Sequence, residues 1–191
     1  MTRRFVSTAS LIVAMAVVAA AGTIEGKVSS GNSVVYVDTI AGKTFPAPTK
    51  PVLTGQKGLA FVPHLLVIQE GTTVDFQNDD SVQHNVFWPS IGGSKKDGHN
   101  MGTWPQGDKR SFKFEHAGVV PLLCNVHSEM SGFIIVSPTP YFVQTDSAGN
   151  FKIENVPDGK YNVVVWHEGS KPQTKPVDVA GTGKVDFTLA K

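Results

Sequence analysis

The sequence predicts an all-β protein made of two units, and three observations support this prediction. After an apolar N-terminal run, no segment has the 3.6-residue hydrophobic period of an amphipathic helix. Short runs rich in Val, Ile, Phe and Tyr are instead bounded by Gly, Pro, Asn and Asp, which is typical of sandwiches and barrels. The pattern of these runs then changes after about residue 138, where a second unit is expected to begin.

The predicted strands follow one another along most of the chain. They are SVVYVDT (33–39), HLLVIQEG (64–71), TTVDFQN (72–78), HNVFW (84–88), KRSFKFE (109–115), SGFIIVS (131–137), NFKIENV (150–156), KYNVVVWHE (160–168) and KVDFTLA (184–190). In the third of these runs, apolar Val74 and Phe76 alternate with polar Asp75 and Gln77. A period of two residues indicates a strand with one buried and one exposed face.

The connections between these strands also carry local signals. The stretch 90–109 is Gly-rich and polar, and it is expected to be a long loop with solvated His99 and Met101. A weak second metal site at those two residues is the alternative. The segment 41–52 contains three prolines and is expected to connect the two units. Pro121, inside the last strand before the single cysteine, predicts an edge position or a bulge.

Residues 1–21 are expected to be a secretory signal peptide. Arg3 and Arg4 precede a short apolar run that ends at Ala20, and small residues surround Ala21. The run is shorter than the ~20 residues of a membrane-spanning helix, so the protein is expected to be exported, periplasmic or secreted, with no membrane span. Without the two arginines, 15 basic side chains face 16 acidic ones, a balance that gives no electrostatic footprint for nucleic acid.

The segment 138–191 has turn signals at residues 146–149 and 157–159, and each is followed by a predicted strand. The motifs TDSAGNF and PDGKYNVVV in it resemble the transthyretin-like modules of the carboxypeptidase regulatory family. The resemblance implies a small β-sandwich, but such modules usually open with a Gly-rich strand and a partner strand that this segment lacks. The N-terminal stretch 22–46 contains that pattern within 22–39. We therefore expect a discontinuous domain, in which the N-terminal strands complete the C-terminal sandwich.

The only cysteine of the chain lies in CNVHSEM (124–130). Cys124, His127 and Met130 offer a thiolate, an imidazole and a thioether at intervals of three residues. A lone cysteine in an exported protein is metal-bound, reactive, intermolecularly paired or simply buried. His84 opens a predicted strand and is a candidate second imidazole, because a strand end and a late loop can meet at one pole of a sandwich. Two imidazoles, a thiolate and a weak axial thioether are the ligands of an electron-transfer copper site.

The segment from about residue 50 to 137 resembles the cupredoxins, the small blue copper proteins of the amicyanin and plastocyanin type. The motifs that carry the resemblance are, in order, F-x-P (61–63), G-T-x-V-x-F (71–76), HNV (84–86) and C-x-x-H-x-x-M-x-G (124–132). The resemblance implies that residues 47–137 form a Greek-key β-sandwich. It also implies one type 1 copper per chain, with four ligands: His84, Cys124, His127 and Met130.

The resemblance further implies that Asn85 braces the two ligand-bearing loops, and that the backbone near Asn125 donates to the cysteine sulfur. The implied function is transport of single electrons between protein partners such as a c-type cytochrome or a dehydrogenase, so the chain is not expected to be an enzyme. Two other classes stay open. One is copper storage or delivery, and the other is a cell-surface binding module with an incidental copper site. Zinc is disfavoured because it seldom takes a thioether ligand.

Overall fold

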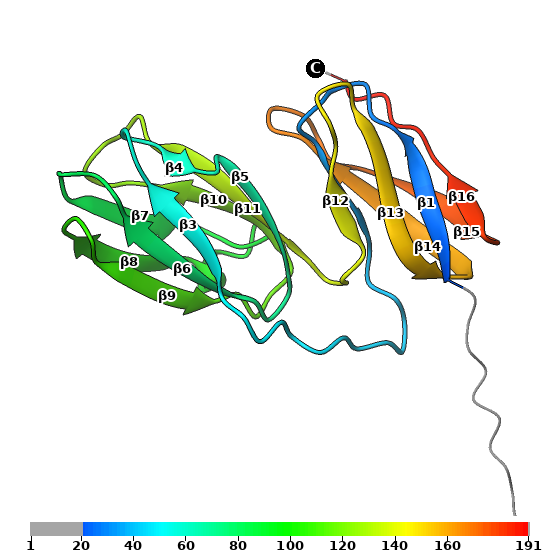
Figure 1. Ribbon diagram of the computed structural model, residues 1–191, viewed down its shortest axis with the longest axis horizontal. Coiled ribbons are helices and arrows are strands. Elements are labelled where there is room, and N and C mark those ends of the chain that lie inside the picture. Colours follow the sequence, from blue (N-terminus) through cyan, green and yellow to red (C-terminus); the bar gives the residue numbers. More distant parts are fainter. Residues whose placement is uncertain (1–20, 191) are drawn as a thin grey trace, which may run out of the picture.

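The computed structural model describes residues 21–190 of the chain. Figure 1 shows two β-sandwiches side by side, joined by an extended segment and by the passage from β11 to β12. Within the described residues the only helix is a short 3₁₀ turn, η1 (Lys95–Asp97), so the predicted all-β fold is confirmed. No helix in this part of the chain is long and apolar enough to cross a membrane. The expected signal peptide lies outside the described residues except for Ala21.

The first sandwich consists of two sheets, with strand orders β5-β11-β10-β7-β8 and β4-β3-β6-β9. Its strands are β3 (Val52–Gln56), β4 (Phe61–Val62), β5 (Leu65–Gln69), β6 (Thr73–Asn78), β7 (His84–Trp88), β8 (His99–Trp104), β9 (Lys109–Lys113), β10 (Gly118–Leu123) and β11 (Ser131–Ser137). The pairs β5–β11 and β3–β6 are parallel, and the other pairs are antiparallel. Val74 and Phe76 on β6 are fully buried between the sheets, as their alternation predicts. Trp88 and Trp104 belong to the same core.

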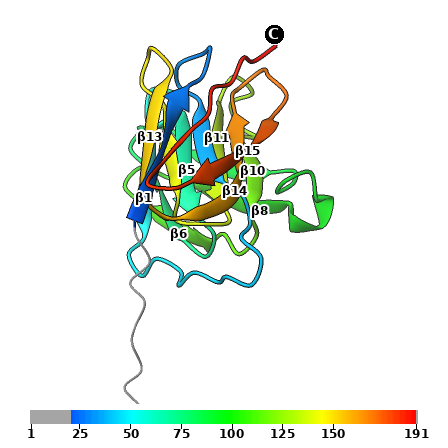
Figure 2. The ribbon, with the colours of Figure 1, turned by 90° about the vertical axis from the view of Figure 1, so that its right-hand side faces the viewer.

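The second sandwich combines strands from both ends of the chain, with strand orders β13-β1-β16 and β12-β2-β14-β15. Its strands are β1 (Ala21–Lys27), β2 (Val34–Val37), β12 (Phe142–Gln144), β13 (Asn150–Pro157), β14 (Gly159–Trp166), β15 (Gln173–Val179) and β16 (Thr182–Lys184). β1 pairs with β13, beside which it lies in Figure 2, and with β16. β2 lies between β12 and β14. This is the pairing that a discontinuous domain requires, with the first sandwich inserted between β2 and β12.

Several local predictions differ from the structure. The stretch 90–109 is not one loop, because β8 pairs with β7 inside it and buries Met101 in the core. Of the predicted strand 184–190, only Lys184 belongs to a strand, and Phe187 makes a single bridge to Val28. Further strands were not predicted: β3, β4, β12 and β15. These segments are short or lack apolar alternation, so pairing with neighbours determines their conformation.

Pro121 neither forms a bulge nor lies on an edge strand. The register between β10 and β11 runs without interruption from Gly118 to Leu123, and Pro121 pairs with Phe133. On its other side, however, β10 meets β7 only at Leu123. The proline therefore lies where β10 has no ladder partner on that side, and its missing N–H leaves no strand hydrogen bond unmade.

The two sandwiches contact one another through the two faces of β11. Ile134 and Val136 point into the core of the first sandwich. Ile135, on the opposite face, is buried against Val34 and Trp166 of the second sandwich. β11, which follows the cysteine loop (residues 124–130), thus packs on the first core with one face and on the second sandwich with the other.

Candidate metal centre

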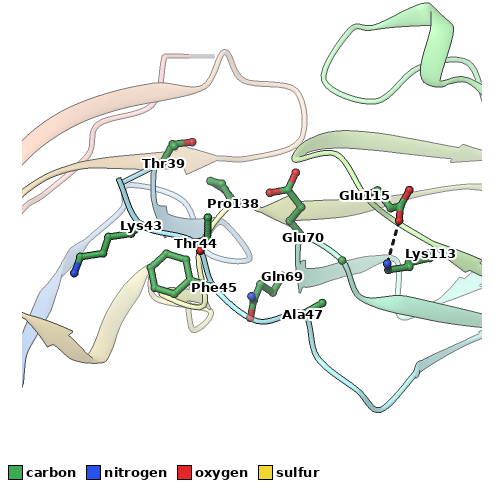
Figure 3. Close-up of a pocket in the computed structure, with 11 residues that line it drawn as sticks. Thr39, Lys43, Thr44, Phe45, Ala47, Gln69, Glu70, Lys113, Glu115 and Pro138 are labelled. Atoms are coloured by element: carbon green, nitrogen blue, oxygen red, sulfur yellow. Dashed lines mark hydrogen bonds and ion pairs between the residues drawn. The ribbon is translucent and has the colours of Figure 1, made fainter. Parts of the chain in front are cut away.

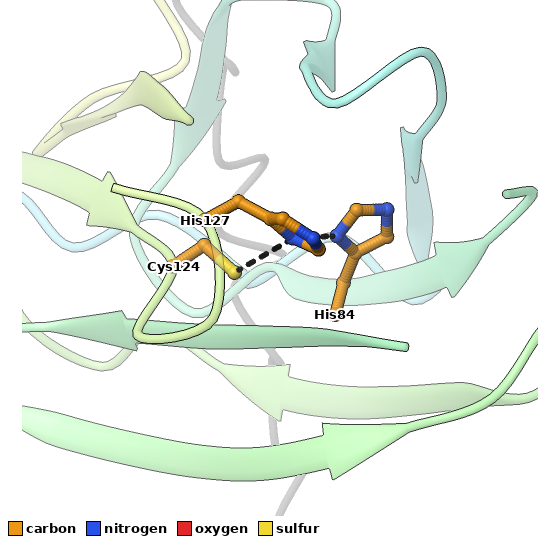
Figure 4. Close-up of side chains that lie close together, drawn as sticks. All are labelled: His84, Cys124 and His127. Carbon is orange, nitrogen blue, oxygen red and sulfur yellow. Dashed lines mark hydrogen bonds between the residues drawn. The ribbon is translucent and has the colours of Figure 1, made fainter. Parts of the chain in front are cut away.

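Three side chains converge at one pole of the first sandwich. His84 opens β7, Cys124 follows the end of β10, and His127 lies in the cysteine loop between β10 and β11. Because β7 and β10 are antiparallel neighbours, the start of one and the end of the other lie at the same edge of the sheet. One potential ligand atom from each residue lies within 4.8 Å of the other two, and Figure 4 shows the three side chains turned toward one another.

The two imidazoles face the centre with the same ring nitrogen. His84 Nδ1 lies 3.1 Å from His127 Nδ1, and His127 Nδ1 lies 4.0 Å from Cys124 Sγ. His84 is fully buried and Cys124 is 5% exposed, whereas His127 is only partly buried. Two imidazole nitrogens and a thiol sulfur around one point are a donor set suited to copper.

Asp80, which the sequence analysis did not single out, determines which nitrogen of His84 is available. Its Oδ2 lies 2.8 Å from His84 Nε2. The backbone N–H groups of Gly58 and Leu59 donate to the same carboxylate at 2.7 and 3.0 Å. These backbone donors first, and His84 after them, lower the Asp80 pKa to about 2, so the group is an ionised acceptor. His84 Nε2 therefore carries the proton, and the Nδ1 lone pair faces the centre.

Asn85 joins the segment that carries His84 to the cysteine loop, which is the contact that the resemblance implies. Its Oδ1 accepts a hydrogen bond from Asn125 N at 3.2 Å, and its Nδ2 donates to Gly102 O at 2.8 Å. The donor to the cysteine sulfur differs from the expectation. It is the backbone N–H of Asn85 itself, 3.4 Å from Cys124 Sγ, because the N–H of Asn125 is directed to the Asn85 side chain.

Met130 ends the cysteine loop. Its side chain is 1% exposed and belongs to the core of the first sandwich. Its N–H donates to His127 O at 3.1 Å, which closes a turn between the imidazole and the thioether. The role of Met130 as an axial ligand stays a prediction, as do the ligand roles of the other three residues.

The remaining described histidines lie outside this cluster. His99 is exposed, as expected, although it lies in β8 and not in a loop, and its ring is tilted against Trp88 with 5.4 Å between ring centroids. His116 is exposed, between β9 and β10. His64 and His167 lie at the junction of the two sandwiches.

A separate cavity of about 350 Å³ lies along the connector between the sandwiches (Figure 3). Its charged side chains have both signs, and two of them, Lys113 and Glu115, already pair with one another at 3.0 Å. Lys43 and Glu70 line other parts of the cavity. The charged side chains that line this cavity are not donors of one kind, as a site for a metal or an anion would require. The cluster of His84, Cys124 and His127 is therefore the stronger candidate for a functional site.

Comparisons with known proteins match two segments of the chain to family models. Residues 50–137 match the family model of the copper binding proteins of the plastocyanin/azurin family. Residues 133–190 match that of the carboxypeptidase regulatory-like domain. A search of curated proteins found no match.

Similar solved structures include three copper proteins. The reduced Cu(I) form, at pH 4, of an amicyanin variant has 20% identity and a TM-score of 0.42, with 51% of this chain and 88% of that chain covered. The novel purple cupredoxin from Nitrosopumilus maritimus has 29% identity and a TM-score of 0.40, with 45% and 99% covered. The Cu-containing nitrite reductase (NirK) from Thermus scotoductus SA-01 has 25% identity and a TM-score of 0.43, with 52% and 25% covered. The chain thus combines a segment that matches the plastocyanin/azurin family of copper binding proteins with a segment that matches the carboxypeptidase regulatory-like domain.

Proposed function

We propose that this protein is an exported type 1 copper protein that carries single electrons between protein partners. One copper ion per chain would be held by four side chains: His84, Cys124, His127 and Met130. The observation that carries the proposal is the convergence of two Nδ1 atoms and one Sγ at the pole of the first sandwich. A bound copper would supply the Cu(II)/Cu(I) couple, with the thiolate as its strongest donor.

The residues around the cluster support electron transfer, which favours a site that rearranges little between two oxidation states. Asp80 contacts His84 Nε2, the ring nitrogen that does not face the cluster. The Asn85 side chain accepts from Asn125 N and so joins the segment of His84 to the cysteine loop. The Asn85 N–H also points at the cysteine sulfur, where a hydrogen bond stabilises negative charge on the thiolate. These contacts are all made between protein groups, so the fold itself restrains the positions of the cluster's side chains.

The surface at this pole supports docking of another protein. His127 is the partly exposed member of the cluster, and its neighbour Val126 is 50% exposed. Leu59, which contacts Asp80 through its N–H, is 42% exposed. Exposed apolar side chains around the edge of the His127 imidazole give a redox partner a contact surface from which water is excluded. They also leave only a short distance for an electron to pass through that ring. A c-type cytochrome or a dehydrogenase would fit this role.

The first test is the visible absorption of the chain from residue 22 onward, titrated with Cu(II). We expect an intense sulfur-to-copper charge-transfer band that saturates at one metal per chain and disappears in Cys124→Ser. His116→Ala is the matched control, because it removes an exposed imidazole outside the cluster. Reversible voltammetry with retained metal would support electron transport. Tight Cu(I) binding without a charge-transfer band would instead indicate copper storage or delivery.

A further inference from the structure

The second sandwich contacts the chain immediately after Met130, at the start of β11. Two contacts of different chemistry reach this point, one through Ser131 and one through Phe133. Both come from the end of β14 and the turn that follows it, which carry Trp166 and Glu168. Because Ser131 is the residue next to Met130, any restraint on it is transmitted to the end of the cysteine loop.

The first contact is polar and passes through His64. Glu168 Oε2 lies 2.8 Å from His64 Nε2, although the two residues are 104 positions apart. The other ring nitrogen, His64 Nδ1, lies 3.1 Å from Ser131 O. Both partners are acceptors, so the ring makes both hydrogen bonds only with a proton on each nitrogen. The backbone of His64 adds a third contact, because its carbonyl accepts the N–H of Phe133 at 2.8 Å.

The second contact is aromatic. The Phe133 ring packs on Trp166 with 5.0 Å between centroids, and the His64 ring also meets Phe133, edge-on at 5.7 Å. Trp166 is 6% exposed and is buried with Ile135 in the junction between the sandwiches. This contact is largely dry, whereas His64 and Glu168 are each half exposed beside a junction cavity of about 590 Å³.

Gly132, between the two contact points, leaves little room for movement. A Cβ on this residue would lie 3.0 Å from His64 O and 3.1 Å from Phe61 Cβ. The start of β11 is thus pressed against β4 and the residues that follow it, while the second sandwich holds it from the other side. A displacement of the second sandwich would therefore move residues 131–133 rather than be absorbed locally.

We propose that Glu168 and Trp166 are positioning residues for the cysteine loop. Acting through His64 and Phe133, they let the second sandwich influence where Met130 lies relative to the other predicted ligands. This assigns the second sandwich a role in tuning the metal centre. The consequence for the metal rests on the proposed function, but the restraint on residues 130–133 does not.

The restraint is tested without metal by hydrogen exchange of the full exported chain. In Glu168→Ala, we expect the backbone amides of residues 130–133 to exchange about two- to fivefold faster, the range for loss of one exposed ion pair. Glu154→Ala is the matched control, because Glu154 is an exposed glutamate of the same sandwich that pairs with Lys152 at 2.9 Å. Glu168→Gln keeps an acceptor and is expected to restore part of the protection.

The tuning is tested with copper bound. We expect Glu168→Ala and Trp166→Leu to shift the reduction potential and the ratio of the visible bands, with one copper per chain retained and Glu154→Ala unchanged. Trp166→Phe keeps an aromatic ring at the junction and guards against misfolding of the leucine variant. We expect it to give a smaller shift than the leucine variant.

Two results would overturn the proposal, and they are separable from failure of the proposed function. Unchanged amide exchange of residues 130–133 in both Glu168→Ala and Trp166→Leu would refute the restraint, whatever the metal does. An unchanged potential and spectrum in all these variants, with a normal copper band in the parent protein, would remove the tuning. Absence of a copper band in the parent protein would refute the proposed function and the tuning together, and would leave the restraint to be decided by the exchange data.

Discussion

The two sandwiches differ in what they bury. In the described part of the chain, the first sandwich buries large polar side chains near the pole of the candidate site: Gln56, Asn78, His84 and Asn85. The second buries an aliphatic and aromatic core with only small hydroxyl residues such as Ser33 and Thr145. Burying an amide or an imidazole costs free energy unless each polar atom is bonded. Polar burial therefore lowers the stability of the first sandwich in a way that a purely structural unit avoids. This loss of stability is concentrated where the predicted ligands meet.

The largest effect is expected from a cavity in the second sandwich. Ile153 is 3% exposed in its core, and Ile153→Ala should lower the free energy of unfolding by about 2–5 kcal/mol. Leu53→Ala is the control, because Leu53 is 57% exposed. Urea unfolding measures the loss. The folded variant should keep one copper per chain, because Ile153 lies in the core of the second sandwich and not in the junction cluster of Trp166. Loss of copper without unfolding would contradict the view that this core serves stability alone.

The next effect concerns the contact between Asp80 and His84. In Asp80→Asn the amide can present a donor to Nε2, which frees the ring to adopt the wrong tautomer. We expect copper affinity to fall about 10–100-fold, the usual cost of losing a partner that orients a metal-bound histidine. Competition with a chelator measures the affinity. Asp79→Asn, which changes an adjacent carboxylate not bonded to His84, should leave the affinity unchanged, and an equal loss there would indicate a general charge effect.

The same carboxylate makes metal-free stability depend on pH. The Asp80 pKa is lowered from 3.8 to about 2 in the folded protein, chiefly by the N–H groups of Gly58 and Leu59. A group with a depressed folded pKa contributes stability above its unfolded pKa, and this contribution is lost as pH falls through the folded value. The stability difference between the parent protein and Asp80→Asn should thus be full above pH 4 and shrink toward pH 2. A difference that is constant over this range in unfolding experiments would contradict the assignment.

The smallest effect should follow from removing a buried polar group. Gln56 is fully buried and its Oε1 has no hydrogen-bond partner among residues 21–190, while its Nε2 donates to Asn85 O at 3.4 Å. Gln56→Leu should therefore change the free energy of unfolding by no more than about 1 kcal/mol, in either direction. A loss of stability well above this value in thermal or urea unfolding would mean that Gln56 is needed to hold Asn85. Burial of polar side chains at this pole would then cost less free energy than expected.

Much of the fold was predictable because its strongest signals are local. The alternation of Val74 and Phe76 and the run that opens at His84 appear as strands close to the predicted bounds. β8 was missed because His99, Asn100 and Gly102 interrupt its apolar pattern, and its strand conformation depends on pairing with β7. β15 was missed for a related reason, since it contains Pro176 and is held as an edge strand by β14 alone.

The sequence by itself determined the chemistry of the candidate site, because the spacing of Cys124, His127 and Met130 is a property of one short loop. Only the tertiary structure decided what holds that chemistry in place. Asp80 meets the turn at Gly58 because β3 and β6 run parallel, with Gln56 beside Asn78, so the residues after both strands emerge at the same edge. The contact of His64 with Glu168 likewise exists because β14 ends beside β11. Such contacts join segments that are far apart in the chain, so no local pattern of residues can encode them.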